Sequence, residues 1–297
     1  MESIKSNTWT GKKPVGKREE TIDVLEKLSW TVQPPLGLVV GDYHFAENHF
    51  APHFVGDSGY HGKLEVVTDS KKILHVEFNE DTAPSYYKQM FQNIAKRRSG
   101  FCFYQATKAR TAQTLKVLNN GLTSVEQQMI AENRLTGEFD LVVGASNSVR
   151  RSFLILAETI ASSLDKPSGS RYYGYAQNFG GGITGWLQVV VTNNKIVQCF
   201  YDEIFADTQE EISDESLQQY YRQSKYYCLE YEPAYPDGFN TTFDLLEQKV
   251  IASQDLLDIQ GLPWTTDTGS RKRNPEYDNY LRLATVIQAE VTKDGLS

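Results

Sequence analysis

The chain has 297 residues, of which 40% are hydrophobic and 12% aromatic, and its formal net charge is −8. Such a chain can bury a sizeable core in one or two domains, and its negative charge argues against a nucleic-acid partner, which would meet a basic surface. No apolar run is long enough to span a membrane and no export signal is visible at the N-terminus, so we expect a cytoplasmic protein.

Residues 1–35 are expected to be an appended arm rather than part of a core. They are mostly polar and end at Pro34-Pro35. Within them, Ile22, Leu25 and Leu28 have the spacing of a short helix.

The rest of the chain contains an internal repeat. Residues 62–80 match residues 185–203 without a gap, at a constant shift of 123 and with seven of nineteen positions identical. Each copy is predicted to be a β-hairpin, because apolar residues alternate on both sides of a turn at 69–70 or 193–194. The alternating residues are Leu64, Val66, Leu74, Val76 and Phe78 in the first copy and Leu187, Val189, Val191, Val197, Cys199 and Tyr201 in the second.

Two later matches extend the repeat. Residues 85–89 resemble residues 219–223, each in a predicted helix, and both halves end in a longer helix. The first terminal helix follows Ser148, and the second begins at Asn274-Pro275, with Asn274 as its cap. Their predicted buried residues are Val149, Phe153, Leu156, Ile160 and Leu164 in the first and Tyr280, Leu281, Ala284, Ile287 and Val291 in the second.

These matches predict an α+β fold of two tandem, similar units, at residues 36–166 and 167–297. Each unit is expected to be a twisted antiparallel sheet of hairpins packed against helices. Pro167-Ser-Gly-Ser170 is the natural linker between them.

Residues 140–148 are the strongest candidate for a binding site. A short strand is predicted up to Val143, a Gly-Ala-Ser turn follows, and Ser148 stands where a helix N-cap is expected. Arg150-Arg151 then adds positive charge where the helix macrodipole is already positive. Free N–H groups, hydroxyls and arginines together indicate an anion site, most simply for a phosphate. The competing interpretation is an ordinary helix cap beside two exposed arginines.

A hairpin, a Tyr-rich segment and a Gly-Ala-Ser turn before a helix resemble the FMN-binding domain family. That family includes flavin subunits of sodium-pumping NADH:quinone oxidoreductases and bacterial pheromone-precursor and electron-transfer lipoproteins. The second unit resembles the lipoprotein type at Tyr173-Gly-Tyr-Ala176, at the hairpin from Gly182 to Ile196, and at Tyr201-Asp-Glu203 with residues 215–223. The resemblance covers nearly all of both units, and it implies a soluble flavoprotein that exchanges electrons with a redox partner protein.

The resemblance also implies which residues hold FMN. The family motif is Asp-x-x-Ser/Thr-Gly-Ala-Thr, whose last Thr can carry the FMN phosphate covalently. Here Val143 replaces the Ser/Thr and Ser146 replaces the Thr, which favours non-covalent FMN. The second unit lacks Gly-Ala-Thr within residues 258–270, and Pro263 removes an N–H donor there, so that unit is expected to be a structural copy or half of a composite site. The implied cofactor-binding residues are Asp140, Val143, Gly144, Ala145, Ser146, Asn147, Ser148 and Arg151.

Other chemistries have weaker signals. His44, His49, His53 and His61 lie close in sequence but without recognised ligand spacing, so we expect ordinary strand and loop histidines rather than a metal site. The three cysteines show no ligand spacing, and Cys102 and Cys199 fall inside apolar runs, so these two are expected to be buried small hydrophobes rather than part of a disulfide framework. No nucleophile-elbow, P-loop or dinucleotide motif is present, and Gly180-Gly-Gly182 precedes a hairpin strand. The alternative function is a degenerate binding or scaffold module without flavin, while no substrate motif supports an FMN- and nicotinamide-dependent oxidoreductase.

Overall fold

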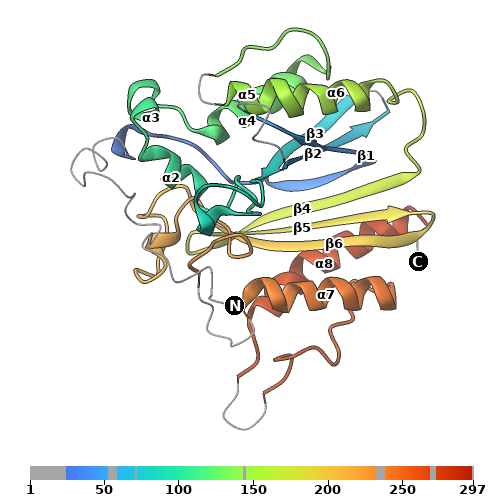
Figure 1. Cartoon of the computed structure of the whole chain (residues 1–297). Coiled ribbons are helices and arrows are strands. Elements are labelled where there is room, and N and C mark those ends of the chain that lie inside the picture. Colours follow the sequence, from blue (N-terminus) through green and yellow to red (C-terminus); the bar gives the residue numbers. More distant parts are fainter. Residues whose placement is uncertain are drawn as a thin grey trace.

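One antiparallel sheet of six strands organises the protein, in the order β3-β2-β1-β4-β5-β6 (Figure 1). The computed structural model describes residues 25–52, 59–70, 72–142, 145–231, 238–267 and 272–295. The predicted α+β class, with antiparallel hairpins packed against helices, is confirmed. The strands are β1 (Gly37–Phe50), β2 (Tyr60–Asp69), β3 (Lys72–Asp81), β4 (Ser170–Gly180), β5 (Ile183–Thr192) and β6 (Lys195–Phe205).

Helices cover the outer sides of the two halves of the sheet. Helices α4 and α6 pack on β1, β2 and β3, whereas α7 and α8 pack on β4, β5 and β6, so the two halves of the sheet lie between two helical layers (Figure 1). No helix in the described part of the chain is both long and apolar enough to cross a membrane. The helices are α2 (Phe101–Ala106), α3 (Ala109–Thr114), α4 (Leu118–Glu132), α5 (Ser146–Ser148), α6 (Leu154–Ala161), α7 (Phe239–Ser253) and α8 (Glu276–Lys293), with a π-helical turn at Val149–Phe153 and 3-10 turns at Gln89–Phe91 and Gln218–Tyr220.

The strands alternate between a helix-facing side and an inner side. In β2, Leu64 and Val66 are fully buried in the core under α4 and α6, while Lys63 and Glu65 line a pocket on the other side. In β5, Leu187 is likewise buried under α7 and α8. Because successive side chains of a strand point to opposite faces, each half has its own apolar core and the inner faces are left to line an interior space.

The edges of the sheet are joined at one end by two short segments. Ala95 forms a β-bridge with Asp81 of β3, and Ser224 forms one with Ile204 of β6. The two segments also meet each other, because the backbone N–H of Ser224 donates to the carbonyl of Arg98 at 3.1 Å. The sheet therefore wraps around an interior that is closed at this end.

The two halves share the order of three strands, a 3-10 turn and two longer helices, whereas α2 and α3 have no counterpart in the described part of the second half. The paired hairpins lie at the predicted shift of 123, and both break register at the same place, between Val67 and Thr68 and between Val190 and Val191. In each half a lysine of the edge segment pairs with the glutamate near the end of the last strand: Lys96 with Glu80, and Lys225 with Glu203. These matches support duplication as an interpretation. Because β1 pairs with β4, however, both halves share one continuous sheet.

The register breaks overturn two predicted core positions. Ile73 and Ile196 are buried, whereas Leu74 is half-buried and Val197 is 49% exposed. A bulge adds one residue on one strand and so exchanges the inward and outward positions beyond it. The predictions for Leu74 and Val197 are therefore wrong, while the other alternating residues of both hairpins are confirmed as buried.

Two further expectations about local structure are corrected. Residues 85–89 and 219–223 form no regular helices, and the only helical turns near them are the 3-10 turns at Gln89–Phe91 and Gln218–Tyr220. Ala95 and Ser224 form the corresponding β-bridges of the two halves, and counting back from them does not bring the two Tyr-Tyr pairs to the same position. The two pairs are therefore not equivalent. The described part of residues 1–35 is also more than an arm. Its apolar side chains enter the first core, where the buried residues are Leu28, Trp30 and Val32.

The terminal helices largely agree with prediction. In the first, Leu164 is only half-buried; in the second, Leu281 is half-buried and Leu283 takes its place in the core. Asn274 caps the second helix, since its Oδ1 accepts from the backbone N–H of Glu276 at 2.9 Å. All three cysteines are buried, and none forms a disulfide within the described residues. The predicted positions that are confirmed as buried are Val149, Phe153, Leu156, Ile160, Tyr280, Ala284, Ile287 and Val291.

Candidate functional site

The segment leading to the predicted site is held by a side chain rather than by a strand. Leu141 and Val142 belong to no strand, so that part of the predicted strand is wrong. Instead the amide of Gln128 in α4 bonds Asp140 twice: Oε1 accepts from the Asp140 N–H at 2.8 Å and Nε2 donates to its carbonyl at 3.0 Å. The exposed Asp140 is thus a backbone anchor. Val143 and Gly144 lie outside the described residues.

The turn into the helix differs from the expected cap. The helix begins at Ser146, directly after the buried Ala145, so Ser148 is a buried helical residue and not the N-cap. Ala145 packs on Gly121 of α4, where an added Cβ would lie 2.1 Å from the Ala145 Cβ. A glycine at this position of α4 is therefore what allows the turn to approach the helix.

The two arginines do not provide the predicted positive charge beside Ser146. Arg150 is exposed, and the Arg151 guanidinium donates from Nη1 to the carbonyl of Ala51 at 2.9 Å. Both follow Ser148 within a π-helical turn, which changes the direction of their side chains relative to an α-helix. Neither lines the pocket described next.

Ser146, Asn147 and Ser148 nevertheless line a pocket of about 200 Å³, here called the serine pocket. Its aromatic side chains come from β2, from the segment after β3 and from α2, and its positive charges come from residues 96–110. The other lining residues are Pro52, Tyr60, Tyr86, Lys96, Phe101, Tyr104, Gln105, Lys108, Arg110 and Leu118.

The charges of the serine pocket are not all neutralised by the protein. Lys96 pairs with the buried Glu80, and its ammonium lies 4.6 Å above the Tyr60 ring. Lys108 donates from Nζ to the Tyr104 hydroxyl at 2.7 Å. Neither Lys108 nor Arg110 has a carboxylate within ion-pair distance among the described residues. The pocket is therefore locally positive in an acidic protein, and it can accept an anion.

The hydroxyls of the serine pocket stay neutral. Burial, together with the hydrogen bond to Tyr87, raises the pKa of Tyr86 and of Tyr104 above the ordinary tyrosine value. Both phenols can therefore donate hydrogen bonds at neutral pH. The sequence did not single out Lys108, Arg110 or Tyr104, because they belong to no motif and only the fold brings them to Ser146. Tyr86 belongs to the repeated segment 85–89 but was not predicted as a site residue.

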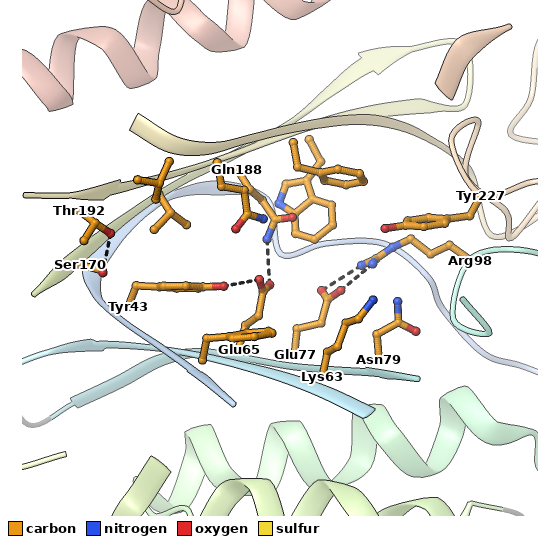
Figure 2. Close-up of a pocket in the computed structure, with 16 residues that line it drawn as sticks. Tyr43, Lys63, Glu65, Glu77, Asn79, Arg98, Ser170, Gln188, Thr192 and Tyr227 are labelled. Carbon is orange, nitrogen blue, oxygen red and sulfur yellow. Dashed lines mark hydrogen bonds and ion pairs between the residues drawn. The ribbon is translucent and has the colours of Figure 1, made fainter. Parts of the chain in front are cut away.

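A larger pocket of about 410 Å³ occupies the interior between the two halves of the sheet; we call it the central hollow (Figure 2). At its closed end the Arg98 guanidinium forms a bidentate ion pair with Glu77, at 2.6 and 3.0 Å, and lies 4.5 Å from the centre of the Trp186 ring. Burial would raise the pKa of Glu77, but the charges of Arg98 and Arg97 outweigh it and hold that pKa at about 2. The lining residues are Tyr43, Phe45, Lys63, Glu65, Glu77, Asn79, Arg98, Ser170, Trp186, Gln188, Val190, Thr192, Val197, Gln198, Phe200 and Tyr227.

A hydrogen-bond network crosses the middle of the central hollow. The Tyr43 hydroxyl donates to Glu65 at 2.6 Å, and the Gln188 amide donates to Glu65 at 3.4 Å (Figure 2). The same amide also donates to the Tyr172 hydroxyl at 3.0 Å. Tyr43 and Tyr172 stand at matching places, opposite Val67 and Val190, so the network joins equivalent residues of the two halves. The sequence pattern assigns these polar residues to solvent-facing sides of hairpins and gives no sign that the sheet encloses them.

The histidines form pairs rather than a cluster. His61 bonds Glu47 through Nε2 at 2.9 Å, and its ring stacks on that of His49 at 4.6 Å. His53 lies outside the described residues. Within the described ranges, no three His, Cys, Asp or Glu side chains come together in a way that could hold a metal ion.

Comparisons with known proteins give little guidance. No protein-family model and no curated protein matches the chain. The crystal structure of the CPE2226 protein from Clostridium perfringens is similar over 43% of this chain and 90% of its own, at 17% sequence identity and a TM-score of 0.30. That similarity is too low to establish a shared fold, and a function for this chain has to be inferred from its own residues and pockets.

Proposed function

We propose that the protein binds FMN non-covalently in the serine pocket and transfers electrons through the bound flavin to a redox partner. The observation that carries the proposal is the meeting of Ser146, Asn147 and Ser148 with Lys108 and Arg110 in one pocket. The first three come from the stretch that resembles a flavin phosphate motif. The other two add positive charge that no carboxylate neutralises in the described part of the chain.

The phosphate would be held by charge-assisted hydrogen bonds. A phosphate monoester carries nearly two negative charges at neutral pH, so it needs local cations even in a protein of net charge −8. Lys108 and Arg110 can supply them, and Ser146 can donate a hydroxyl hydrogen bond.

The aromatic lining fits a flat cofactor. Four aromatic side chains line the pocket and can pack against part of a conjugated ring system: Tyr60, Tyr86, Phe101 and Tyr104. The ammonium groups of Lys96 and Lys108 already lie over three of these rings, so contact with the flavin would use the remaining faces and edges. The pocket volume of about 200 Å³ is below the roughly 300–1,000 Å³ of most ligand sites, so only part of FMN would be enclosed. When bound, FMN would supply the electron transfer, while the protein residues hold and orient it.

The alternative is a binding or scaffold module that holds no flavin. The small volume of the serine pocket favours it, as does Val143 at a position where the resembling family has a hydroxyl. In that case the same positive pocket would bind a smaller anion, or none.

The proposal is tested by incubating purified protein with FMN, removing free flavin and recording the visible spectrum. We expect a yellow protein whose flavin is released by acid, because attachment is non-covalent. Substituting both Lys108→Ala and Arg110→Ala should weaken FMN binding at least about tenfold, since each charge-assisted hydrogen bond contributes roughly 1.5–3 kcal/mol. Lys195→Ala, on an exposed turn of the other half, is the matched control. A protein that stays colourless would reject the flavin, and unchanged binding by the double variant would show that the pocket is wrong.

A further inference from the structure

Glu65 is the one lining residue of the central hollow whose charge has no counter-charge. Among the described residues, Arg98 is paired with Glu77, and the Lys63 ammonium lies 2.7 Å from Asp81. Glu65 has no ion-pair partner in the same set. A half-buried carboxylate of this kind is costly to the folded state unless something compensates its charge.

The groups that face Glu65 leave its charge uncompensated. Tyr43 on β1 and Gln188 on β5 are neutral donors, and Tyr172 on β4 is a buried phenol. On the β3 side the Glu77–Arg98 pair has no net charge. Burial raises the pKa of Glu65 above the ordinary value, and Glu77 adds to that rise while Arg98 opposes it. The site is thus built to accept a positive group from outside.

Aromatic rings surround the space that such a group would enter. Five aromatic residues from both halves of the chain line the hollow: Tyr43, Phe45, Trp186, Phe200 and Tyr227. Figure 2 shows Tyr43 and Tyr227 on opposite sides of it. Aromatic faces attract ammonium groups through their quadrupoles. The Arg98 guanidinium already lies on the Trp186 ring, so the other rings would receive the ligand's ammonium group. Phe45 is 46% exposed, so a ligand can reach the hollow from the Phe45 side.

We propose that the central hollow binds a small organic ammonium ion, whose protonated nitrogen pairs with Glu65 and whose apolar part lies against the aromatic side chains. The volume of about 410 Å³ falls within the range of small-molecule sites. The site is separate from the serine pocket, which shares none of its lining residues, so it does not depend on FMN binding.

The internal match between the halves provides a conservative test variant. Gln188 occupies in β5 the place that Glu65 occupies in β2, since each stands two residues before the bulge on the inner face. A glutamine is therefore already accommodated in this environment, and Glu65→Gln should fold while losing the charge. Glu158→Gln, at an exposed position of α6 outside the hollow, is the matched control.

The experiment is a calorimetric titration of the protein with three ligands: 2-phenylethylammonium, neutral 2-phenylethanol and phenylacetate. We expect the ammonium to bind at least about tenfold more tightly than the alcohol, and phenylacetate to bind least. Glu65→Gln should remove that preference, Phe45→Ala should weaken ammonium binding roughly two- to fivefold, and Glu158→Gln should change nothing.

Three results would overturn the proposal. They are equal binding of the ammonium and the alcohol, no ammonium binding at millimolar concentration, and an unchanged preference in Glu65→Gln. Should Glu65→Gln fail to fold by circular dichroism, the exposed-site variant Phe45→Ala decides, because unaltered ammonium binding there also contradicts the site.

Discussion

The Glu77–Arg98 ion pair at the closed end of the central hollow should be a major contributor to stability. Glu77→Gln keeps the shape of the side chain but removes its charge, and it leaves the buried Arg98 guanidinium without a counter-ion. Lowering the Glu77 pKa from 4.5 to about 2 corresponds to roughly 3 kcal/mol of stabilisation at pH 7, because one pKa unit corresponds to about 1.4 kcal/mol. Breaking a buried ion pair typically costs about 3–5 kcal/mol, which agrees with that figure.

The sign of the pH dependence follows from the direction of the pKa change. Since the pKa of Glu77 is lowered in the folded state, its stabilisation is fully present above the unfolded pKa and is lost as pH falls from 4.5 towards about 2. The difference between wild type and Glu77→Gln should therefore shrink from about 3 kcal/mol at pH 7 to about 1–1.5 kcal/mol at pH 3.

Urea denaturation at pH 7, 5, 4 and 3 measures this difference directly. Glu158→Gln, at an exposed position of α6, should change stability by less than about 1 kcal/mol at every pH. A Glu77→Gln protein within about 1 kcal/mol of wild type at pH 7 would refute the reasoning, as would a difference that grows on acidification.

Two further predictions concern the first half of the chain. Phe153→Ala should lower the free energy of unfolding by about 3–5 kcal/mol, because Phe153 is fully buried and its ring stacks on Phe78 with the ring centres 4.9 Å apart. The control Ile155→Ala, at an exposed position, should lower it by less than about 1 kcal/mol. Thermal denaturation measures both variants. Gly121→Ala should weaken FMN binding while the protein stays folded, because the new methyl group would lie 2.1 Å from the Ala145 Cβ and must displace the turn that carries Ser146. Wild-type FMN affinity in Gly121→Ala would contradict the second prediction.

The repeat at residues 62–80 and 185–203 made the hairpins predictable. A match without gaps fixes strand, turn and strand together, and alternation then assigns the inner and outer faces. Two things were not predictable from that pattern. The bulge that buries Ile73 instead of Leu74 adds a residue without a sequence signature, and the pairing of β1 with β4 depends on contacts between distant segments.

The candidate sites divide in the same way. Ser146 and Ser148 were found because they stand beside each other in a recognisable turn. Lys108 and Arg110 are almost forty residues away, so only the packing of α2 and α4 brings them to the same pocket. Glu65 was missed for a different reason. A polar residue that alternates with apolar ones in a hairpin is expected to face solvent, and only the wrapping of the sheet places Glu65 inside the central hollow.

The most direct test of the proposed function is a comparison of FMN with riboflavin in calorimetric titrations of the wild type and of the variant with both Lys108→Ala and Arg110→Ala. The two ligands differ only in the phosphate, so their difference in affinity isolates the contribution of the proposed phosphate site. We predict that the wild type binds FMN at least about tenfold more tightly than riboflavin, and that the double variant largely loses this preference. Equal affinity of the wild type for both ligands, or no binding of either, would contradict a flavin phosphate site at Ser146–Ser148.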